Sequence, residues 1–429
     1  MSTDAPDGTA APAAAKPVVP PESHRVPARF LAPYAAATLG MWMAILTPVI
    51  LTLAVKVERI APDGKETALS AVLGAGAVLG LLCNPIFGQL SDRTTSRWGR
   101  RRPWLVGSVV TGTGGLVVTG TATSLPVLLL GWCVTQAAFN AMLATMLALL
   151  PDHVPAPRRG LVSGVLGVCQ ALAAVSGAAL AQITGPHSAM AFVIPGLVAC
   201  ATCGWLVAVL PDRRLKGPAR SPFSWRELLH SFWVDPRRHP DFAWAWLSRF
   251  MIFMAISSVL NYQVYYLTDQ LGLSKDESTR MVAVGIAVQT GVVVVGSYLF
   301  GWLSDRLARR KPFVVTAAAI GAAGLLTLAL GQSVTWFLCA MALVGLGQGV
   351  YFAVDLALVT DVLPDSRTRA AKDLGVINIA NILPQSIAPA FAPVFIGLGG
   401  GDNYTALFLA GTAFAVASAV TIVPVRGVR

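Results

Sequence analysis

Residues 84–104 read NPIFGQLSDRTTSRWGRRRPW, a short polar stretch that holds five arginines and one aspartate. The apolar runs on either side of these charges, 67–91 and 104–123, contain no charged residue. An apolar run of about 20 residues is long enough to cross a bilayer as an α-helix. The charged part of this stretch, residues 92–103, is therefore predicted to be a loop that joins two membrane-spanning helices.

The composition of the whole chain favours the same class of protein. Of its 429 residues, 55% are hydrophobic and 12% are charged, whereas an ordinary soluble protein carries about 25% charged residues. The net charge of +11 could indicate a nucleic-acid partner, but the basic residues lie in short loops between apolar runs. That placement favours orientation in a membrane over a phosphate-binding surface. We expect an integral membrane protein that contacts lipid and binds no nucleic acid.

Twelve apolar runs of spanning length follow one another along the chain. They are expected to be helices, because lipid cannot satisfy backbone polar groups and the runs lack the two-residue alternation of barrel strands. The predicted fold class is all-α and integral to the membrane. The predicted spans are 30–56, 67–91, 104–123, 126–150, 161–183, 189–210, 242–268, 278–303, 313–331, 335–360, 372–398 and 404–423.

Basic residues are distributed unevenly between the two sides of the predicted bundle. With twelve spans, both termini and every second loop share one side, which carries 26 of the 32 lysines and arginines. The positive-inside rule places this side in the cytoplasm. Residues 1–29 are rich in Ala and Pro and have no apolar signal-peptide core, so we expect a disordered tail there. The chain is predicted to be a multi-pass protein of the cytoplasmic (plasma) membrane with both termini inside.

Two sequence landmarks recur at one spacing. GQLSDR at 88–93 returns as GWLSDR at 301–306, and Leu-Pro-Asp at 150–152 returns at 363–365, each 213 residues later. A shared offset predicts duplication of a six-span unit, with two pseudo-symmetric six-helix halves. The predicted segments are a cytoplasmic tail at 1–29, a six-helix bundle at 30–210, a cytoplasmic linker with an interfacial helix at 211–241, a second bundle at 242–423 and a tail at 424–429.

Polar side chains are placed selectively within the spans. Asparagine, glutamine and charged residues are disfavoured in lipid, and every third span, namely 3, 6, 9 and 12, contains none. This pattern predicts a central cavity lined by the other eight spans. Amides hydrogen bond to hydroxyl groups and aromatic rings stack on sugar C–H faces, which fits a polyhydroxylated solute. Hydrogen bonding between helices is the alternative role for the same residues. The candidate substrate-binding residues are Trp42, Gln136, Asn140, Gln170, Asn261, Tyr262, Gln263, Tyr265, Gln289, Asn378, Asn381 and Gln385.

Two charged residues lie well inside predicted spans. Arg249 and Asp355 are both about 10 Å from the cytoplasmic edge at ~1.5 Å per residue. An isolated charge at this depth is disfavoured by a few kcal/mol, so pairing is attractive. The alternative for Arg249 is snorkelling to the inner surface. We hypothesise that Asp355 is a titratable coupling or gating group with Arg249 as its partner.

The pattern G-x-L-S-D-R…G-R-R-R at 88–102 resembles the signature loop of the major facilitator superfamily. Its fuller form over 84–104, together with Leu46-Thr47-Pro48, is similar to the sucrose/proton symporters and to the glycoside-pentoside-hexuronide:cation symporter group. In that family the aspartate of this loop helps to lock the cytoplasmic side while the outer side is open. The resemblance thus implies gating roles for Asp92, Arg93, Arg97, Arg100, Arg101 and Arg102, and for the equivalent Asp305 and Arg306.

Departures from these relatives bear on coupling. Asn84 stands where the related melibiose-type symporters have an aspartate, which does not favour sodium coupling. Spans 1–6 contain no mid-membrane carboxylate, so proton coupling would depend on Asp355, and facilitated diffusion is the alternative.

We therefore predict a secondary transporter that moves a sugar or glycoside, similar to sucrose or maltose, by alternating access with proton symport. An exporter of drug-like or biosynthetic metabolites by proton antiport is the first alternative. An integral-membrane enzyme or a receptor without transport is the second. The chain has no G-x-x-x-x-G-K-[ST] or H-E-x-x-H motif, so we expect no enzyme, no metal and no cofactor apart from a coupling proton. A monomer that binds a small-molecule substrate is expected.

Overall fold

The computed structural model describes residues 28–155, 159–212, 235–307, 309–362, 370–399 and 403–425. Within these ranges the chain forms helices and no strands. The elements are α1 (Ala28–Thr47), η2 (Pro48–Thr52), α2 (Leu53–Ile60), α3 (Lys65–Arg93), α4 (Arg102–Thr121), α5 (Leu125–His153), α6 (Arg159–Thr184), α7 (Met190–Val209), α9 (Pro240–Leu260), α10 (Gln263–Tyr265), η4 (Tyr266–Gln270), α11 (Lys275–Leu307), α12 (Lys311–Leu330), α13 (Val334–Val362), α14 (Ala370–Ile396) and α15 (Tyr404–Thr421).

The prediction of twelve spans is confirmed. Twelve helical segments of the described chain are long and apolar enough to cross a membrane. The loop predicted at 92–103 lies close to where expected, because α3 ends at Arg93 and α4 begins at Arg102. Most of the predicted tail at 1–29 and of the predicted linker with its interfacial helix at 211–241 lies outside the described residues. Of the parts that are described, 28–29 already belong to α1, and α9 begins at Pro240, inside the predicted linker.

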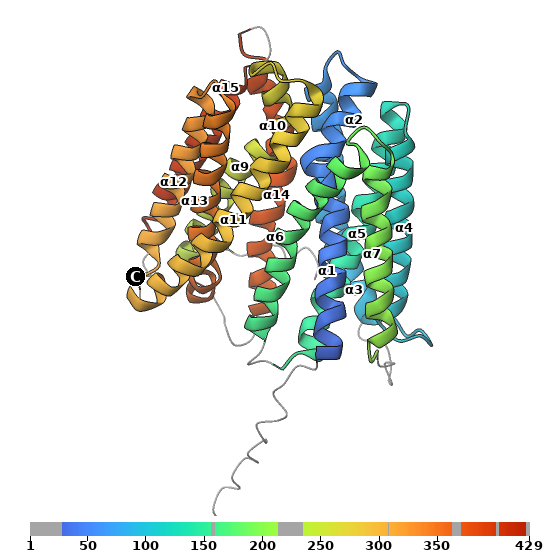
Figure 1. The fold of residues 1–429 in the computed structure, drawn as a ribbon. Helices are drawn as coiled ribbons and strands as arrows, with labels where there is room; N and C mark the ends of the chain where they lie inside the picture. Colours follow the sequence, from blue (N-terminus) through green and yellow to red (C-terminus); the bar gives the residue numbers. More distant parts are fainter. Residues whose placement is uncertain are drawn as a thin grey trace, which may run out of the picture.

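The helices pack as two groups of equal design (Figure 1). In the N-terminal group (α1–α7), α1 packs on α6 and α7, and α5 packs on α3 and α4. In the C-terminal group (α9–α15), α9 packs on α14 and α15, and α13 packs on α11 and α12. These pairs correspond one to one, which is the arrangement that a duplicated six-helix unit produces.

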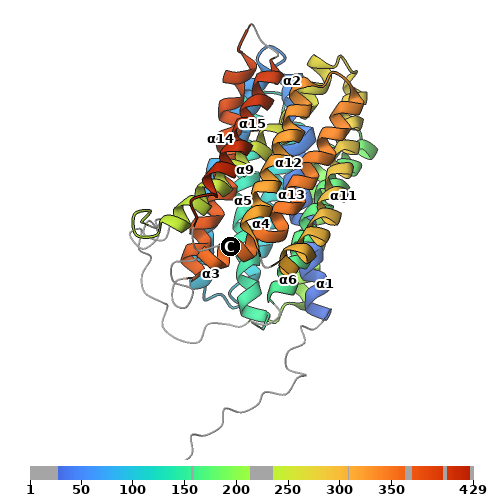
Figure 2. The ribbon, with the colours of Figure 1, turned by 90° about the vertical axis from the view of Figure 1, so that its left-hand side faces the viewer.

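The two groups meet along two pairs of helices, α3 with α14 and α6 with α11. The four helices that lack Asn, Gln and charged residues in the bilayer, α4, α7, α12 and α15, pack extensively only within their own group. Figure 1 shows α4 and α7 at one edge of the molecule and α12 near the other, and α12 faces the viewer in Figure 2. The polar-poor spans thus lie away from the contact between the groups.

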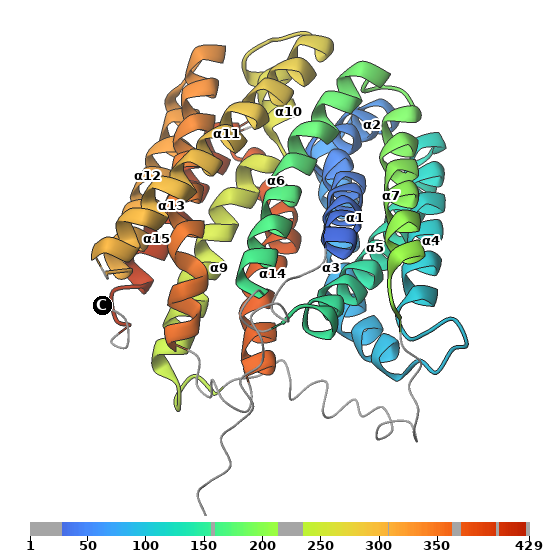
Figure 3. The same ribbon diagram turned by 60° about the horizontal axis from the view of Figure 1, so that its bottom comes forward.

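The two ends of the helix bundle differ in which helix ends they carry. We call the end at which α1 begins and α15 ends the terminal face, and the other end the opposite face. The terminal face is at the bottom of Figure 1 and comes forward in Figure 3. In both views the lower ends of α11 and α13 lie away from α1 and α6.

The seventh span differs from its prediction as one helix over 242–268. Helix α9 ends at Leu260, and α10 and η4 follow after a break at Asn261–Tyr262. The Asn261 amide donates to the Ser257 carbonyl at 3.1 Å, taking the acceptor that an uninterrupted helix reserves for a backbone N–H. At the break, a side chain therefore competes with the backbone for this carbonyl.

The first span is interrupted at the equivalent place. Helix α1 passes into the π-helix η2 at Pro48, which is 213 residues before Asn261. Proline has no N–H to donate to the preceding turn, so the regular ladder is broken there. The duplicated unit thus carries an interruption at the same position in both copies.

Candidate functional site

A buried charged cluster lies inside the C-terminal group. Arg249 of α9 donates from a terminal guanidinium nitrogen to the carboxylate of Asp355 on α13. Its Nε donates to Oδ1 of Asn381 on α14 at 2.6 Å. The side chains of Arg249 and Asp355 are only 12% and 13% exposed. The ion pair hypothesised from the sequence is therefore present, while its coupling role stays a prediction.

Aromatic and amide groups surround this pair. The hydroxyl of Tyr351 hydrogen bonds to the Asp355 carboxylate. The Arg249 guanidinium lies 5.8 Å from the ring centroid of Phe253. Gln385, which is exposed, donates to the Asn381 carbonyl at 3.3 Å. The cluster therefore joins three helices, α9, α13 and α14, through the single ion pair of Arg249 and Asp355 and the bond to Asn381.

The predicted amides of the N-terminal group share one face of α5. Asn140 donates to the Gln136 carbonyl at 2.9 Å, and Gln136 is buried. On the facing side of α3, Gly76 lies against Gln136 and Gly80 lies against Asn140. This close approach shows that the pair also packs helix α5 on helix α3.

The remaining candidates are spread over several helices. Gln289 of α11 donates to Gln348 of α13 at 3.2 Å, Gln170 of α6 is exposed, and Trp42 of α1 is partly buried. The side chain of Asn378 lies outside the described part of the structure. No hydrogen bond between described side chains joins the amides of α5 or α6 to those of α11 or α14. The structure therefore brings together Arg249, Asp355, Asn381 and Gln385, and separately Gln136 and Asn140.

The four candidates at and just beyond the break in the seventh span are buried near the opposite face. Tyr262 and Ser70 of α3 lie 2.8 Å apart, oxygen to oxygen, and hydrogen bond to each other. Tyr265 donates to the Ala54 carbonyl of α2 at 2.8 Å. Asn261 and Gln263 are also buried. In this conformation the two tyrosines join the groups across the opposite face.

Charged residues close the same face, and sequence reasoning missed them. Lys65 of α3 lies 2.7 Å from Asp269 of η4 and 3.5 Å from Glu58 of α2. Lys275 lies 3.5 Å from Glu58, and His187 lies 3.6 Å from Asp276. These residues lie at or near helix ends, where a charged side chain is usually solvated. Apart from Lys65 and Glu58, the partners are far apart in the sequence.

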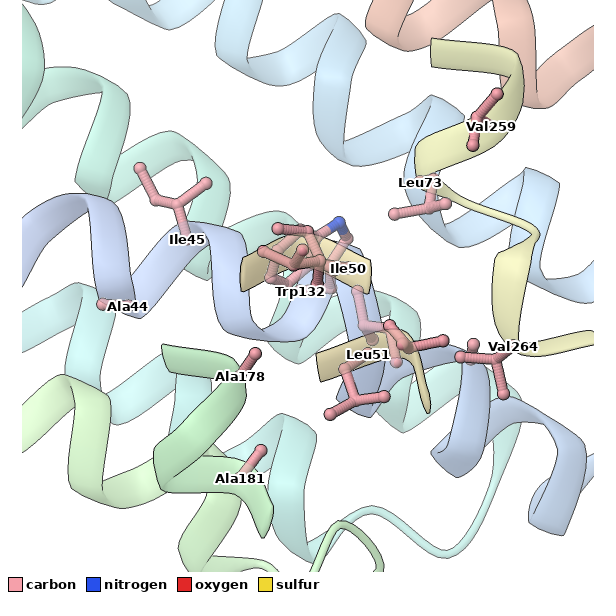
Figure 4. Close-up of a cluster of buried hydrophobic side chains, with 14 of the residues drawn as sticks. Ala44, Ile45, Ile50, Leu51, Leu73, Trp132, Ala178, Ala181, Val259 and Val264 are labelled. Carbon is pink, nitrogen blue, oxygen red and sulfur yellow. The ribbon is translucent and has the colours of Figure 1, made fainter. Parts of the chain in front are cut away.

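The hydrogen bonds and ion pairs described between the two groups all lie near the opposite face. An apolar layer accompanies them, in which Leu51 of η2 lies near Leu73 of α3 and Val264 of α10 (Figure 4). The described structure is thus closed at the opposite face.

The arginine-rich loop forms a network at the terminal face. Arg101 donates to Asp92 at 2.6 Å, to Ser91 at 2.8 Å and to Asp152 at 3.1 Å. Arg100 donates to Asp152 at 2.6 Å. These contacts join the end of α3 to the end of α5 within the N-terminal group. Burial raises the pKa of Asp152, but the hydrogen bond from Arg100 and the charges of Arg101 and Arg100 outweigh it, so the pKa lies below its ordinary value.

Asp212, just after α7, caps the start of α4. Its Oδ2 accepts the backbone N–H groups of Arg101 at 2.7 Å and Arg102 at 2.9 Å, which places an acidic group at the positive end of the helix dipole. Gly99 has φ +105°, and a Cβ at this position would lie 2.2 Å from that oxygen. Glycine is therefore required at position 99 for both its backbone angle and its lack of a side chain.

The other predicted gating residues have individual surroundings. Arg97 lines a cavity of about 370 Å³, and both Arg93 and Arg97 take part in further interactions. The Arg306 guanidinium lies 5.5 Å from the ring centroid of Trp302, and the side chain of Asp305 lies outside the described residues. Within the described ranges, no group of three or more His, Cys, Asp or Glu side chains could hold a metal ion.

Comparisons with known proteins agree with this architecture. The sucrose transport protein SUC3 of Arabidopsis thaliana is 22% identical over 89% of this chain and 84% of its own length. The crystal structure of the nucleoside transporter NupG matches 91% of this chain and 98% of its own, with a TM-score of 0.69 at 12% identity. A bacterial homologue of the human lysosomal transporter Spinster, in an inward-facing and occupied conformation, matches 92% of this chain and 94% of its own, with a TM-score of 0.64 at 15% identity.

The family itself is established by the sequence match. The family model described as the Major Facilitator Superfamily matches residues 30–389 and 266–428. Its members and the structural neighbours are transporters rather than enzymes. With twelve candidate membrane spans in two equivalent groups, the chain belongs to the major facilitator superfamily of multi-pass membrane transporters.

Proposed function

We propose that this transporter moves a sugar or glycoside into the cell together with a proton. The observation that carries the coupling is the buried pair of Arg249 and Asp355, both bonded within the C-terminal group. The similarity to a sucrose transport protein over 89% of the chain supports the substrate class. Exposed or partly buried amides on both groups, such as Asn140 and Gln385, supply donors and acceptors suited to hydroxyl groups.

The coupling step follows from charge. When Asp355 is ionised, it neutralises Arg249 and accepts a hydrogen bond from it. Protonation of Asp355 removes that attraction and leaves Arg249 to its bond with Asn381. Since the three residues belong to three different helices, the packing of α9 against α13 and α14 depends on the proton. Differential stability of two conformations is what couples a bound proton to movement of the groups.

The proposal includes an orientation and an assembly state. The terminal face carries most of the lysines and arginines, so we assign it to the cytoplasm and the opposite face to the exterior of the plasma membrane. A monomer is sufficient, because two groups of helices within one chain provide both sides of an alternating-access cycle. The segments 30–210 and 242–423 are assigned as its two moving bodies.

Uptake of labelled sucrose into proteoliposomes tests this proposal. With the external solution acidic, the protein is expected to accumulate sucrose above the external concentration, and a protonophore is expected to abolish accumulation. Uptake that only equilibrates would replace symport by facilitated diffusion. No uptake by folded protein would remove sucrose as the substrate, and extrusion driven by the reversed gradient would favour the exporter.

A further inference from the structure

At the closed opposite face, Lys65 and Asp269 form an ion pair between the two groups, with Nζ and Oδ1 2.7 Å apart and both side chains largely buried. We infer that Lys65 is a latch residue, which holds the two groups together at this face through Asp269 and must release it before the face can open. This role goes beyond the proposed sugar symport and does not depend on the identity of the solute.

The surroundings of Lys65 fix its ammonium group. Nζ lies 2.7 Å from Asp269 of the C-terminal group and 3.5 Å from Glu58 of its own group. It also lies 4.7 Å from the ring centroid of Tyr265. The side chains of Lys65 and Glu58 are each 13% exposed, and that of Asp269 is 16% exposed. Such shielding makes the pair stronger than one at an open surface.

Hydrogen bonds within the C-terminal group fix the carboxylate of Asp269. Its Oδ2 accepts a hydrogen bond from the Tyr404 hydroxyl of α15 at 2.7 Å. Its Oδ1 accepts one from Thr268 at 3.0 Å besides the one from Lys65. The carboxylate is therefore anchored to the C-terminal group, so the Lys65–Asp269 contact transmits force between the groups.

Both carboxylate partners of Lys65 lie just beyond an interruption in a spanning helix, which favours a contact that breaks when the face opens. Glu58 lies in α2, beyond the π-helix η2, and Asp269 lies in η4, beyond the break at Asn261–Tyr262. Interrupted helices give up regular backbone hydrogen bonds and are frequent at functional sites. By contrast, the described bonds of Arg101 at the terminal face stay within one group.

The chain offers a matched control. Lys275 also reaches Glu58, at 3.5 Å, but its side chain is 60% exposed. An exposed pair contributes little because water screens it. Loss of Lys65 instead leaves the shielded carboxylates of Glu58 and Asp269 without their shared cation, which favours separation of the groups.

Labelling of a buried cysteine measures opening directly. Ser70 of α3 is 7% exposed and hydrogen bonds to Tyr262 of the C-terminal group, so the contact between the groups covers it. Ser70→Cys would be introduced, and its reaction with a bulky, charged maleimide followed in purified protein in nanodiscs. Both faces are accessible there, so the result does not depend on orientation. The parent chain with only its native cysteines gives the background.

Lys65→Met is expected to raise the labelling rate about tenfold, in the range of coupling between directly interacting residues. Lys65→Arg, which keeps the charge, is expected to stay within about threefold of the parent, and Lys275→Met within about twofold. Asp269→Ala is expected to match Lys65→Met, and the double variant to add nothing further, since both remove one contact. Unchanged labelling in folded Lys65→Met protein, or effects that multiply in the double variant, would overturn the latch.

Discussion

The carbonyl oxygens of Leu210 and Val423 are equivalent acceptors in the two groups. Each lies at the end of the last helix of its group, and the two residues are 213 positions apart. Arg102 donates to the Leu210 carbonyl at 2.6 Å, and Lys311 donates to that of Val423. Both donors stand at the start of a helix that packs on the one they bond to. In each group, a basic side chain at the start of one helix (α4 or α12) therefore bonds to the end of the last helix (α7 or α15).

Asp355→Asn is expected to uncouple transport from protons. The amide cannot ionise, so the pair with Arg249 no longer changes with pH. With one proton per solute, a gradient of one pH unit supports about tenfold accumulation, and the variant is expected to lose it and only equilibrate. Labelled uptake with Asp63→Asn, in an exposed loop, serves as the control. Accumulation equal to that of the parent would exclude Asp355 as the coupling group.

Arg249→Met is expected to destabilise the protein by about 3–5 kcal/mol, because it leaves the Asp355 carboxylate buried without a cation. Thermal unfolding in detergent measures the loss. The double variant Arg249→Met/Asp355→Leu removes both charges and is expected to recover most of the stability. A double variant as unstable as the single one would show that lost packing, rather than an unpaired charge, is responsible.

Gly99→Ala is expected to lower stability by about 1–3 kcal/mol, a typical penalty for a strained backbone conformation. The residue has φ +105°, and its Cβ would collide with the Asp212 carboxylate that caps α4. Gly107→Ala, inside α4, is the control, since nothing lies within 4 Å of a Cβ there. That substitution is expected to be neutral or stabilising.

Asp152 is expected to make stability depend on acidic pH. Its pKa is below the ordinary value of 3.8 in the folded protein, so it binds a proton more weakly than in the unfolded chain. Its contribution is complete above pH 3.8 and is lost as the pH falls through the folded-state pKa. Unfolding temperatures of the parent and Asp152→Asn should therefore differ near neutral pH and converge in acid. A constant difference across this range would contradict the assignment.

Most of the architecture could be predicted from the sequence because its signals are strong and local. Hydropathy alone locates helices in lipid, and the shared 213-residue offset reports the duplication. The partnership of Arg249 and Asp355 was also accessible, since two opposite charges at one depth of a bilayer have a reason to pair.

The opposite face could not be predicted in the same way. Lys65 and Asp269 are 204 residues apart and lie at helix ends, where a charge needs no partner. Their contact depends on how the two groups approach each other, which no local pattern encodes. The break at Asn261 was missed for a related reason, because hydropathy does not register an amide that captures the Ser257 carbonyl.

The two interruptions differ in the chemistry of the residue that stands at each of them. Pro48 lacks a donor, whereas Asn261 occupies an acceptor. A substitution that restores the regular helix at one position leaves the other untouched. Stiffening one interruption at a time is therefore expected to slow the opening of this transporter from either half separately.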